Sequence, residues 1–113
     1  MSCIFCDIIS GKRHSEIVYE DDRAVAFRDV NPIAPVHILV IPRDHIAGPL
    51  DFDDANEHLA GHLIVVAAKV AQREGLAADG YRLVLNQGRN GGQSVFHVHL
   101  HLLGGRRMAW PPG

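Results

Sequence analysis

Three histidines alternate with apolar residues near the C-terminal end of the sequence, in Phe96-His97-Val98-His99-Leu100-His101-Leu102. In an extended strand successive side chains point to opposite faces, so the three imidazoles are predicted to share one face and the apolar residues to enter the core. Three adjacent imidazoles cost free energy if they serve only the fold, because each has two ring nitrogens that need hydrogen-bond partners and offers little apolar area. The segment is therefore predicted to be functional.

Two chemistries fit such a row of histidines. One is metal binding, because neutral imidazole is a common metal ligand. The other is covalent catalysis, in which an imidazole nitrogen attacks phosphorus, since an imidazole with an ordinary pKa of about 6.5 is substantially neutral at pH 7. The spacing alone does not choose between them.

The loop before these histidines, Gly88-Arg-Asn-Gly-Gly-Gln-Ser94, is rich in glycine. Its backbone N–H groups can face an anion, and Arg89 and Ser94 can add donors. The loop does not match a P-loop, but beside three histidines it is predicted to hold a phosphate.

A C-x-x-C motif, Cys3-Ile-Phe-Cys6, lies at the start of the chain. Three interpretations remain open for it: a redox pair, half of a zinc site, or two buried thiols. A thioredoxin-like redox pair is disfavoured, because no strand of a βαβ unit precedes the motif.

Hydrophobic periodicity predicts the elements that position these residues. A short helix is expected over residues 3–10, with Ser2 as its cap and Gly11 as its end. A long helix is expected from about Asp54 to Glu74, with His58 and His62 on its solvated side. Five strands are expected at Ile17–Glu20, Ala24–Asp29, His37–Ile41, Tyr81–Asn86 and Val95–Leu103. This order predicts an α+β fold, an antiparallel sheet of about five strands with one short N-terminal helix and one long helix on one side.

The composition is that of a globular protein. The 113 residues predict a single domain over 1–113, with 47% hydrophobic residues and a net charge of −2. There is no basic stripe for nucleic acid and no apolar run long enough for a membrane span, so neither partner is expected. Two cysteines and the absence of a signal-like N-terminus predict a cytoplasmic protein.

The segment Gln93-Ser-Val-Phe-His-Val-His-Leu-His-Leu-Leu resembles the defining motif of the histidine triad family, His-φ-His-φ-His-φ-φ with φ apolar. The likeness extends through residues 19–22, 26–32, 34–42 and 86–94. The ending Trp110-Pro-Pro-Gly113 resembles the nucleotide-binding branch, which contains the purine nucleoside phosphoramidases. Dinucleoside-polyphosphate hydrolases of the family typically lack this tail, and uridylyltransferase relatives usually replace the last histidine, which is His101 here.

The resemblance implies a hydrolase that cleaves the P–N bond of purine nucleoside phosphoramidates, including aminoacyl-adenylate-like compounds, without a catalytic cofactor. His99 would be the nucleophile and form a nucleotidyl-histidine, His101 would contact the phosphate and His37 would support the triad. Ser94 would bind the leaving group or the phosphate. The alternatives are a dinucleoside-polyphosphate hydrolase, a nucleotide sensor or scaffold with residual catalysis, and a metalloenzyme whose histidines hold catalytic zinc.

For the AMP-like nucleotide, the resemblance implies that Asp29 holds the ribose hydroxyls, with Asn86 nearby and the backbone around Gly92 and Gln93 at the phosphate. The apolar slot for the base would be formed by Ile4, Phe5, Ile8, Phe27 and Val30. Many relatives carry Ile-Pro after the first helix, where this chain has Lys12-Arg13-His14-Ser15. The choice between purines is therefore left open.

The resemblance also implies a structural zinc ion, since several bacterial members begin with C-x-x-C. Its ligands here would be Cys3, Cys6, His45 and His97. The site would be closed and would clamp the first helix to the sheet. The family is further expected to form homodimers through the long helices and central sheets.

Overall fold

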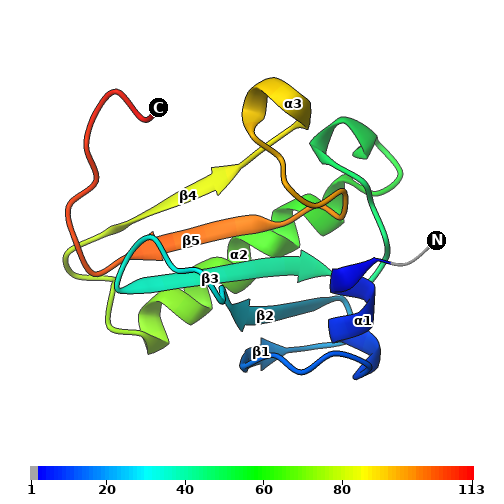
Figure 1. The fold of residues 1–113 in the computed structure, drawn as a ribbon, viewed down its shortest axis with the longest axis horizontal. Helices are drawn as coiled ribbons and strands as arrows, with labels where there is room; N and C mark the ends of the chain where they lie inside the picture. Colours follow the sequence, from blue (N-terminus) through cyan, green and yellow to red (C-terminus); the bar gives the residue numbers. More distant parts are fainter. Residues whose placement is uncertain (1–2) are drawn as a thin grey trace.

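The computed structural model describes residues 3–113, which form a five-stranded antiparallel sheet in the order β1-β2-β3-β5-β4 (Figure 1). The elements, in chain order, are α1 (Ile4–Ser10), β1 (Ile17–Glu20), β2 (Ala24–Arg28), β3 (Val36–Pro42), a 3-10 helix (Pro49–Asp51), α2 (Glu57–Arg73), β4 (Tyr81–Leu85), α3 (Gly88–Gly91) and β5 (Leu100–Gly104). The predicted fold class is confirmed. No helix in the described part of the chain has the length and apolar character needed to cross a membrane.

The two longer helices lie on opposite faces of the sheet, so the prediction that both lie on one side is wrong. Alternate residues of β2 separate the faces: Ala24 and Ala26 pack with α2, whereas Val25 and Phe27 pack with Phe5 of α1. Strand β2 thus has apolar side chains on both faces. The prediction failed because it did not use the continuous apolar run Ala24–Phe27, which marks a strand that is buried on both faces.

Helix α1 begins one residue later than expected. Cys3 is its N-cap, and the Cys3 sulfur accepts a hydrogen bond from the Cys6 backbone N–H at 3.4 Å. Ser2, the expected cap, lies outside the described residues. Gly11 ends the helix in the left-handed conformation, with φ of 85°, as its position predicted.

The last strand is shorter than predicted, because β5 starts at Leu100 and not at Val95. The segment before it leaves the sheet: the Val98 N–H donates to the Ile46 carbonyl at 2.6 Å instead of pairing with a strand. Phe96 is 60% exposed and not in the core. Val98, Leu100 and Leu102 are buried as predicted.

Two polar contacts hold helix α2 against the sheet, one to the turn between β1 and β2 and one to the end of β2. His62 Nε2 lies 2.7 Å from Asp21 Oδ2, so the expectation of a solvated His62 is wrong. Burial acts to raise the pKa of Asp21, but hydrogen bonds from the Arg23 N–H, His62 and the Ala24 N–H outweigh it and hold this pKa well below its ordinary value. Near the C-terminal end of α2, Arg28 makes a bidentate pair with Glu74 at 2.8 and 3.0 Å.

Candidate active site and metal centre

His99 is buried, and the structure determines which of its ring nitrogens is free to react. Its Nδ1 lies 2.9 Å from the His97 carbonyl oxygen. A carbonyl only accepts hydrogen bonds, so Nδ1 carries the proton and Nε2 keeps a lone pair. The Phe5 ring packs edge-on against this imidazole, with centroids 5.1 Å apart, and restricts its rotation. His99 therefore presents a fixed, nucleophilic nitrogen.

His101 and His37 form a hydrogen-bonded pair whose tautomers are also determined. The Ile33 N–H donates to His37 Nδ1 at 3.2 Å, so His37 carries its proton on Nε2. That proton is donated to His101 Nδ1 at 2.9 Å, which leaves His101 with its proton on Nε2. The result is an N–H donor on the ring next to His99, since the two ring centroids are 4.9 Å apart.

The electrostatics of this pair favour neutral rings. Burial lowers the pKa of His37 below its ordinary value, and the charge of Asp29 opposes this only in part. Burial, together with the neighbouring His99 and His37, lowers the pKa of His101 to about 4. Both rings are accordingly neutral at pH 7, so His101 Nδ1 is free to accept the hydrogen bond from His37.

A slot of about 190 Å³ opens beside His99 and contains most of the residues predicted to bind a nucleotide. Its lining includes the predicted residues Ile4, Phe5, Ile8, Phe27, Asp29, Val30, Ser94, His99 and His101. Sequence analysis missed Leu39, which lies on the same face of β3 as His37 and pairs with His101 in the sheet. Strand alternation from His37 could have identified it.

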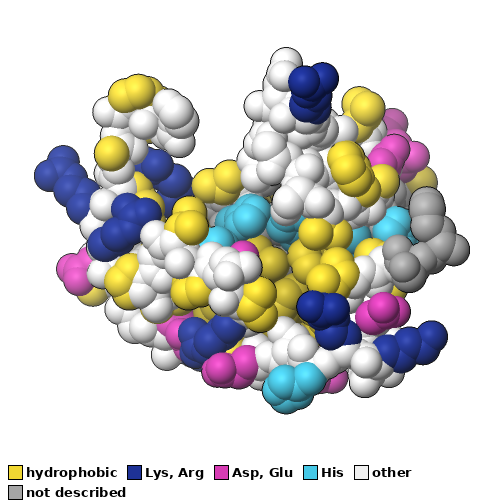
Figure 2. All heavy atoms as spheres, in the orientation of Figure 1, with side chains coloured by type: hydrophobic (Ala, Val, Ile, Leu, Met, Phe, Trp, Pro, Cys, Tyr) yellow, Lys and Arg dark blue, Asp and Glu magenta, His cyan; other side chains and the backbone are white. Residues whose placement is uncertain are grey.

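A second, wider hollow of about 640 Å³ lies on the other side of His101, where Asn86 is found. Asp29, Ser94 and His101 line both hollows, so the two meet at these residues. Arg82 and Arg106, which sequence analysis did not single out, line the far part of this hollow together with the C-terminal tail. Figure 2 shows histidine side chains on the floor between two raised segments, which Figure 1 identifies as the tail and the α3 region.

The glycine-rich loop is built around Gln93. The Gln93 side chain accepts from the Gly88 N–H at 2.9 Å and donates to the Ala47 and Val95 carbonyls at 2.6 and 3.0 Å. The Gln93 side-chain amide therefore makes its hydrogen bonds within the protein. Neither Gly92 nor Gln93 lines the two hollows. The segment 88–91, expected as an irregular loop, forms the short helix α3.

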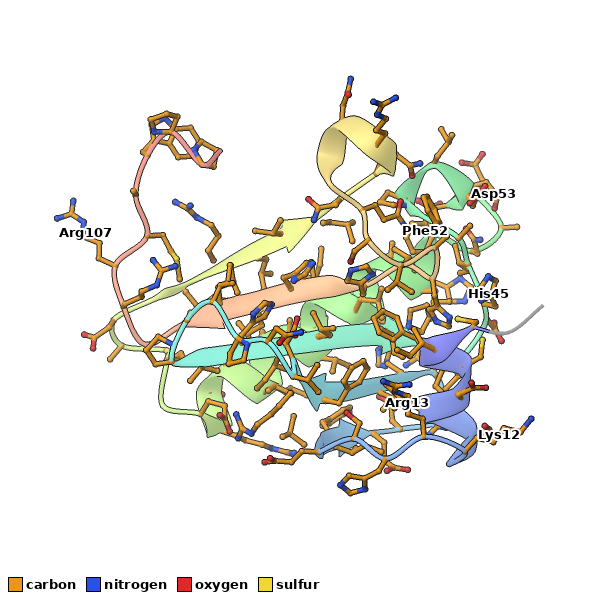
Figure 3. All side chains as sticks on the ribbon, in the orientation of Figure 1. Lys12, Arg13, His45, Phe52, Asp53 and Arg107 are labelled. Atoms are coloured by element: carbon orange, nitrogen blue, oxygen red, sulfur yellow. The ribbon has the colours of Figure 1, made fainter. Side chains whose placement is uncertain are left out.

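The four residues predicted to bind zinc come together at the N-terminal end of α1, and Figure 3 shows His45 there. His97 Nδ1 lies 3.5 Å from the Cys3 sulfur and 3.6 Å from the Cys6 sulfur, and His45 Nδ1 lies 3.4 Å from the Cys6 sulfur. His97 Nε2 donates to the Pro42 carbonyl at 2.8 Å, so the lone pair of His97 is on Nδ1 and points at the sulfurs. Two sulfurs and two imidazole nitrogens are a donor set that suits zinc.

The surroundings of the Cys6 thiol change its pKa. Burial and the neighbouring Cys3 raise the pKa of the Cys6 thiol above its usual value. A divalent cation acts in the opposite direction, because it stabilises the thiolate.

A second group, formed by Asp29, His37 and His101, also has its donor atoms close together, but its protons do not suit a metal. His37 Nε2 would have to lose its proton to bind a cation. The proton would then move to Nδ1, where it would face the Ile33 N–H that now donates to it. Of the two groups found among residues 3–113, this one is better suited to a hydrogen-bonded pair of imidazoles, and the one at the cysteines has the donor set that suits a metal.

Comparison with known proteins identifies the family to which this sequence and fold are similar. A family model described as HIT domain matches residues 10–108. The chain is 52% identical over 105 residues to the purine nucleoside phosphoramidase of Escherichia coli, covering 93% of this chain and 88% of that protein. It is 51% identical over 112 residues to a 14 kDa zinc-binding protein of Zea mays, covering 97% and 87%. The crystal structure of a HIT family hydrolase from Legionella pneumophila superposes with a TM-score of 0.97, at 50% identity, covering 99% and 100% of the two chains.

Proposed function

Because this chain belongs to the histidine triad (HIT) family, we propose that it is a hydrolase of purine nucleoside phosphoramidates that acts through a nucleotidyl-histidine on His99. The observation that carries the proposal is the 2.9 Å contact between His99 Nδ1 and the His97 carbonyl, which leaves Nε2 as the reactive nitrogen. The name of the Escherichia coli relative supports the choice of a P–N bond.

In the first step, His99 Nε2 attacks the phosphorus, a P–N bond to the ring forms and the P–N bond to the leaving amine breaks. The electron pair of the breaking bond leaves with the amine, which takes up a proton from solvent. His101 Nε2–H donates to a phosphoryl oxygen, and Ser94, which lines both hollows, contacts the phosphate or the leaving group. In the second step, water attacks phosphorus and the bond to His99 breaks, with its electron pair returning to Nε2. The proton that the water loses passes to solvent and replaces the one taken up by the amine.

His37 acts through His101 and is a positioning residue. Its proton on Nε2 keeps the His101 lone pair occupied, so that His101 can only present a donor to the substrate. The two neutral rings also place no positive charge beside His99 that would lower its nucleophilicity.

The nucleoside occupies the 190 Å³ slot, with its base between the apolar side chains and its ribose hydroxyls on Asp29. A carboxylate suits two hydroxyl donors because it only accepts hydrogen bonds. The amine side of the substrate then extends into the wider hollow that contains Asn86.

The residues Cys3, Cys6, His45 and His97 hold a structural zinc ion in this proposal. The ion supplies no catalytic chemistry. With four protein ligands the site is closed, so the ligands fix the start of α1 against the segment before β5. The name of the Zea mays relative supports this assignment.

A second copy of the chain is the proposed partner. Strand β4 is an edge of the sheet, and α2 exposes the large apolar residues Ile64 and Val65 on the side away from the core. An open edge and an exposed apolar helix face suit a symmetric pairing of two protomers.

A second candidate activity, hydrolysis of dinucleoside polyphosphates, uses the same nucleophile. The lining of the wider hollow by Arg82 and Arg106 favours it, because guanidinium groups stabilise an anionic leaving group. Comparing cleavage rates of an adenosine phosphoramidate and a diadenosine polyphosphate distinguishes the two activities.

The proposal is tested by following amine release from a fluorogenic nucleoside phosphoramidate, with and without a chelator. We expect turnover by the native protein in both conditions, and a loss of at least about 1000-fold in His99→Ala with retained AMP binding. Turnover by His99→Ala at the native rate would refute the assignment of the nucleophile. Activity that disappears on chelation while the fold persists would favour catalytic zinc.

A further inference from the structure

Besides Asp29, Arg28, Ser94 and the histidines, the nucleotide slot has a further polar border, at the turn that follows α1. Arg13, His14 and Ser15 form this border in the segment that connects α1 to β1. The backbone of this turn is held against α1, because the Arg13 N–H donates to the Asp7 carbonyl at 3.1 Å. A base in the slot therefore lies next to polar side chains whose backbone is held against α1.

Of the two guanidinium groups that line the slot, only one is available to a ligand. Arg28 is engaged by Glu74 at 2.8 and 3.0 Å and by Glu16 at 2.9 Å. Arg13 is paired with no carboxylate among residues 3–113. In Figure 3, Arg13 lies across the front of the sheet beside α1, whereas Lys12 extends outward from the molecule.

A guanidinium offers only donors, in a planar fork that matches two adjacent acceptors. Guanine and hypoxanthine present O6 and N7 as such a pair. Adenine has N7 but carries an amino group at the neighbouring position, which is itself a donor. The apolar walls bind any purine, so the edge facing Arg13 determines the difference between bases.

We propose that Arg13 contacts the O6/N7 edge of the base and makes this protein prefer 6-oxopurine nucleotides, those of guanine and hypoxanthine, over adenine nucleotides. The inference rests on the proposed placement of the nucleoside in the slot. His14 and Ser15 complete the polar border, but each can donate or accept and so selects less strongly between the two kinds of purine.

The test is calorimetric titration of the native protein with GMP, IMP and AMP at one fixed salt concentration. We expect GMP and IMP to bind about fivefold more tightly than AMP, the lower end of the effect of a bidentate contact because Arg13 is exposed. IMP lacks the 2-amino group, so equal affinity for IMP and GMP locates the recognition at O6 and N7. Equal affinity for all three nucleotides would overturn the inference.

Three variants identify the residue responsible. Arg13→Ala removes the preference, and Arg13→Gln moves it toward AMP, because an amide donates to N7 and accepts from the adenine amino group. Lys12→Ala is the matched control: it removes the adjacent positive charge and keeps the preference. A preference that survives in Arg13→Ala, or is lost equally in Lys12→Ala, would overturn the assignment.

These titrations, together with the phosphoramidate cleavage assay, separate this inference from the proposed function. If all three nucleotides bind equally and the phosphoramidate is cleaved, the function stands and the role of Arg13 is wrong. If no nucleotide binds and no phosphoramidate is cleaved, both fail.

Discussion

Two groups of His97 face two different sites. Its ring nitrogen points at the sulfurs of Cys3 and Cys6, while its carbonyl oxygen accepts the proton of His99 Nδ1. The histidines of the row thus have different tasks although they share one spacing. A change of the His97 side chain should affect the proposed metal site first, because the contact with His99 is made by the backbone.

The low pKa of His101 predicts a dependence of stability on pH. A histidine whose pKa is about 4 in the folded protein and about 6.5 when unfolded binds more protons in the unfolded state between these values. The free energy of unfolding should therefore fall as the pH falls from about 6.5 to about 4, by roughly 2 kcal/mol from this residue.

Urea unfolding at pH 7 and pH 4.5 measures this contribution. His101→Gln keeps an acceptor for the His37 N–H but does not titrate, so its loss of stability between the two pH values should be smaller than that of the native protein. An identical loss in both proteins would contradict the assigned pKa.

At the level of residues, sequence analysis found the chemically reactive groups and missed those that the fold brings in. The histidine row and the C-x-x-C motif were recognisable because their residue types are unusual at their spacing. Leu39 is an ordinary leucine in a strand, and only its alternation with His37 could have marked it as a slot residue. Arg13 lies in the segment 12–15 that the sequence analysis associated with the choice of purine, but no role was assigned to its side chain. The roles assigned to Asp29, Asn86, Ser94 and the zinc ligands stay predictions.

Among the elements, the short helix α1 contributes to both the slot and the cysteine site. Its seven residues carry Phe5 and Ile8 into the slot, and its first turn carries the two cysteines. A helix of this length is not stable alone in water, so its position depends on the contacts at both sites. Loss of the metal should therefore loosen α1 before the rest of the sheet.

Removal of zinc is predicted to lower the midpoint of thermal unfolding by about 5–10 °C, since binding to the folded state alone raises stability. Elemental analysis of the purified protein should find one zinc ion per chain. Cys6→Ser should contain no zinc, and its midpoint of thermal unfolding should be lowered by the same amount as that of the zinc-free native protein. Ser10→Ala, at the other end of α1, is the control and should keep the ion. A Cys6→Ser protein with unchanged midpoint and zinc content would refute the site.

The elements differ in how well the sequence predicted them. Strands β1 to β4 and helix α2 were placed within a few residues, because apolar periodicity and glycine or proline boundaries mark their ends. Strand β5 was started too early, because residues 95–99 alternate like a strand but bond elsewhere. Alternation reports which side chains are buried, and it does not report which backbone groups pair.

For the whole molecule, the exposed side of α2 gives the proposed dimer a direct test. Ile64 is 54% exposed on this helix, so Ile64→Glu should not disturb the core but should place a charge in the interface between two copies. Light scattering is expected to show two chains for the native protein and a shift toward one chain for the variant.

Leu50→Glu is the matched control, because Leu50 is exposed on the 3-10 helix and not on α2. It should leave the mass unchanged. A native protein that scatters as one chain at every concentration would refute the dimer.

The sharing of α1 between the slot and the cysteine site has a thermodynamic consequence. Two ligands that stabilise the same short helix are linked, and the linkage is reciprocal: the factor by which zinc raises the affinity for a nucleotide equals the factor by which the nucleotide raises the affinity for zinc. A helix that is already ordered by one ligand costs less conformational entropy to the other. The occupancy of the metal site would in this way set the nucleotide concentration at which the enzyme becomes half saturated.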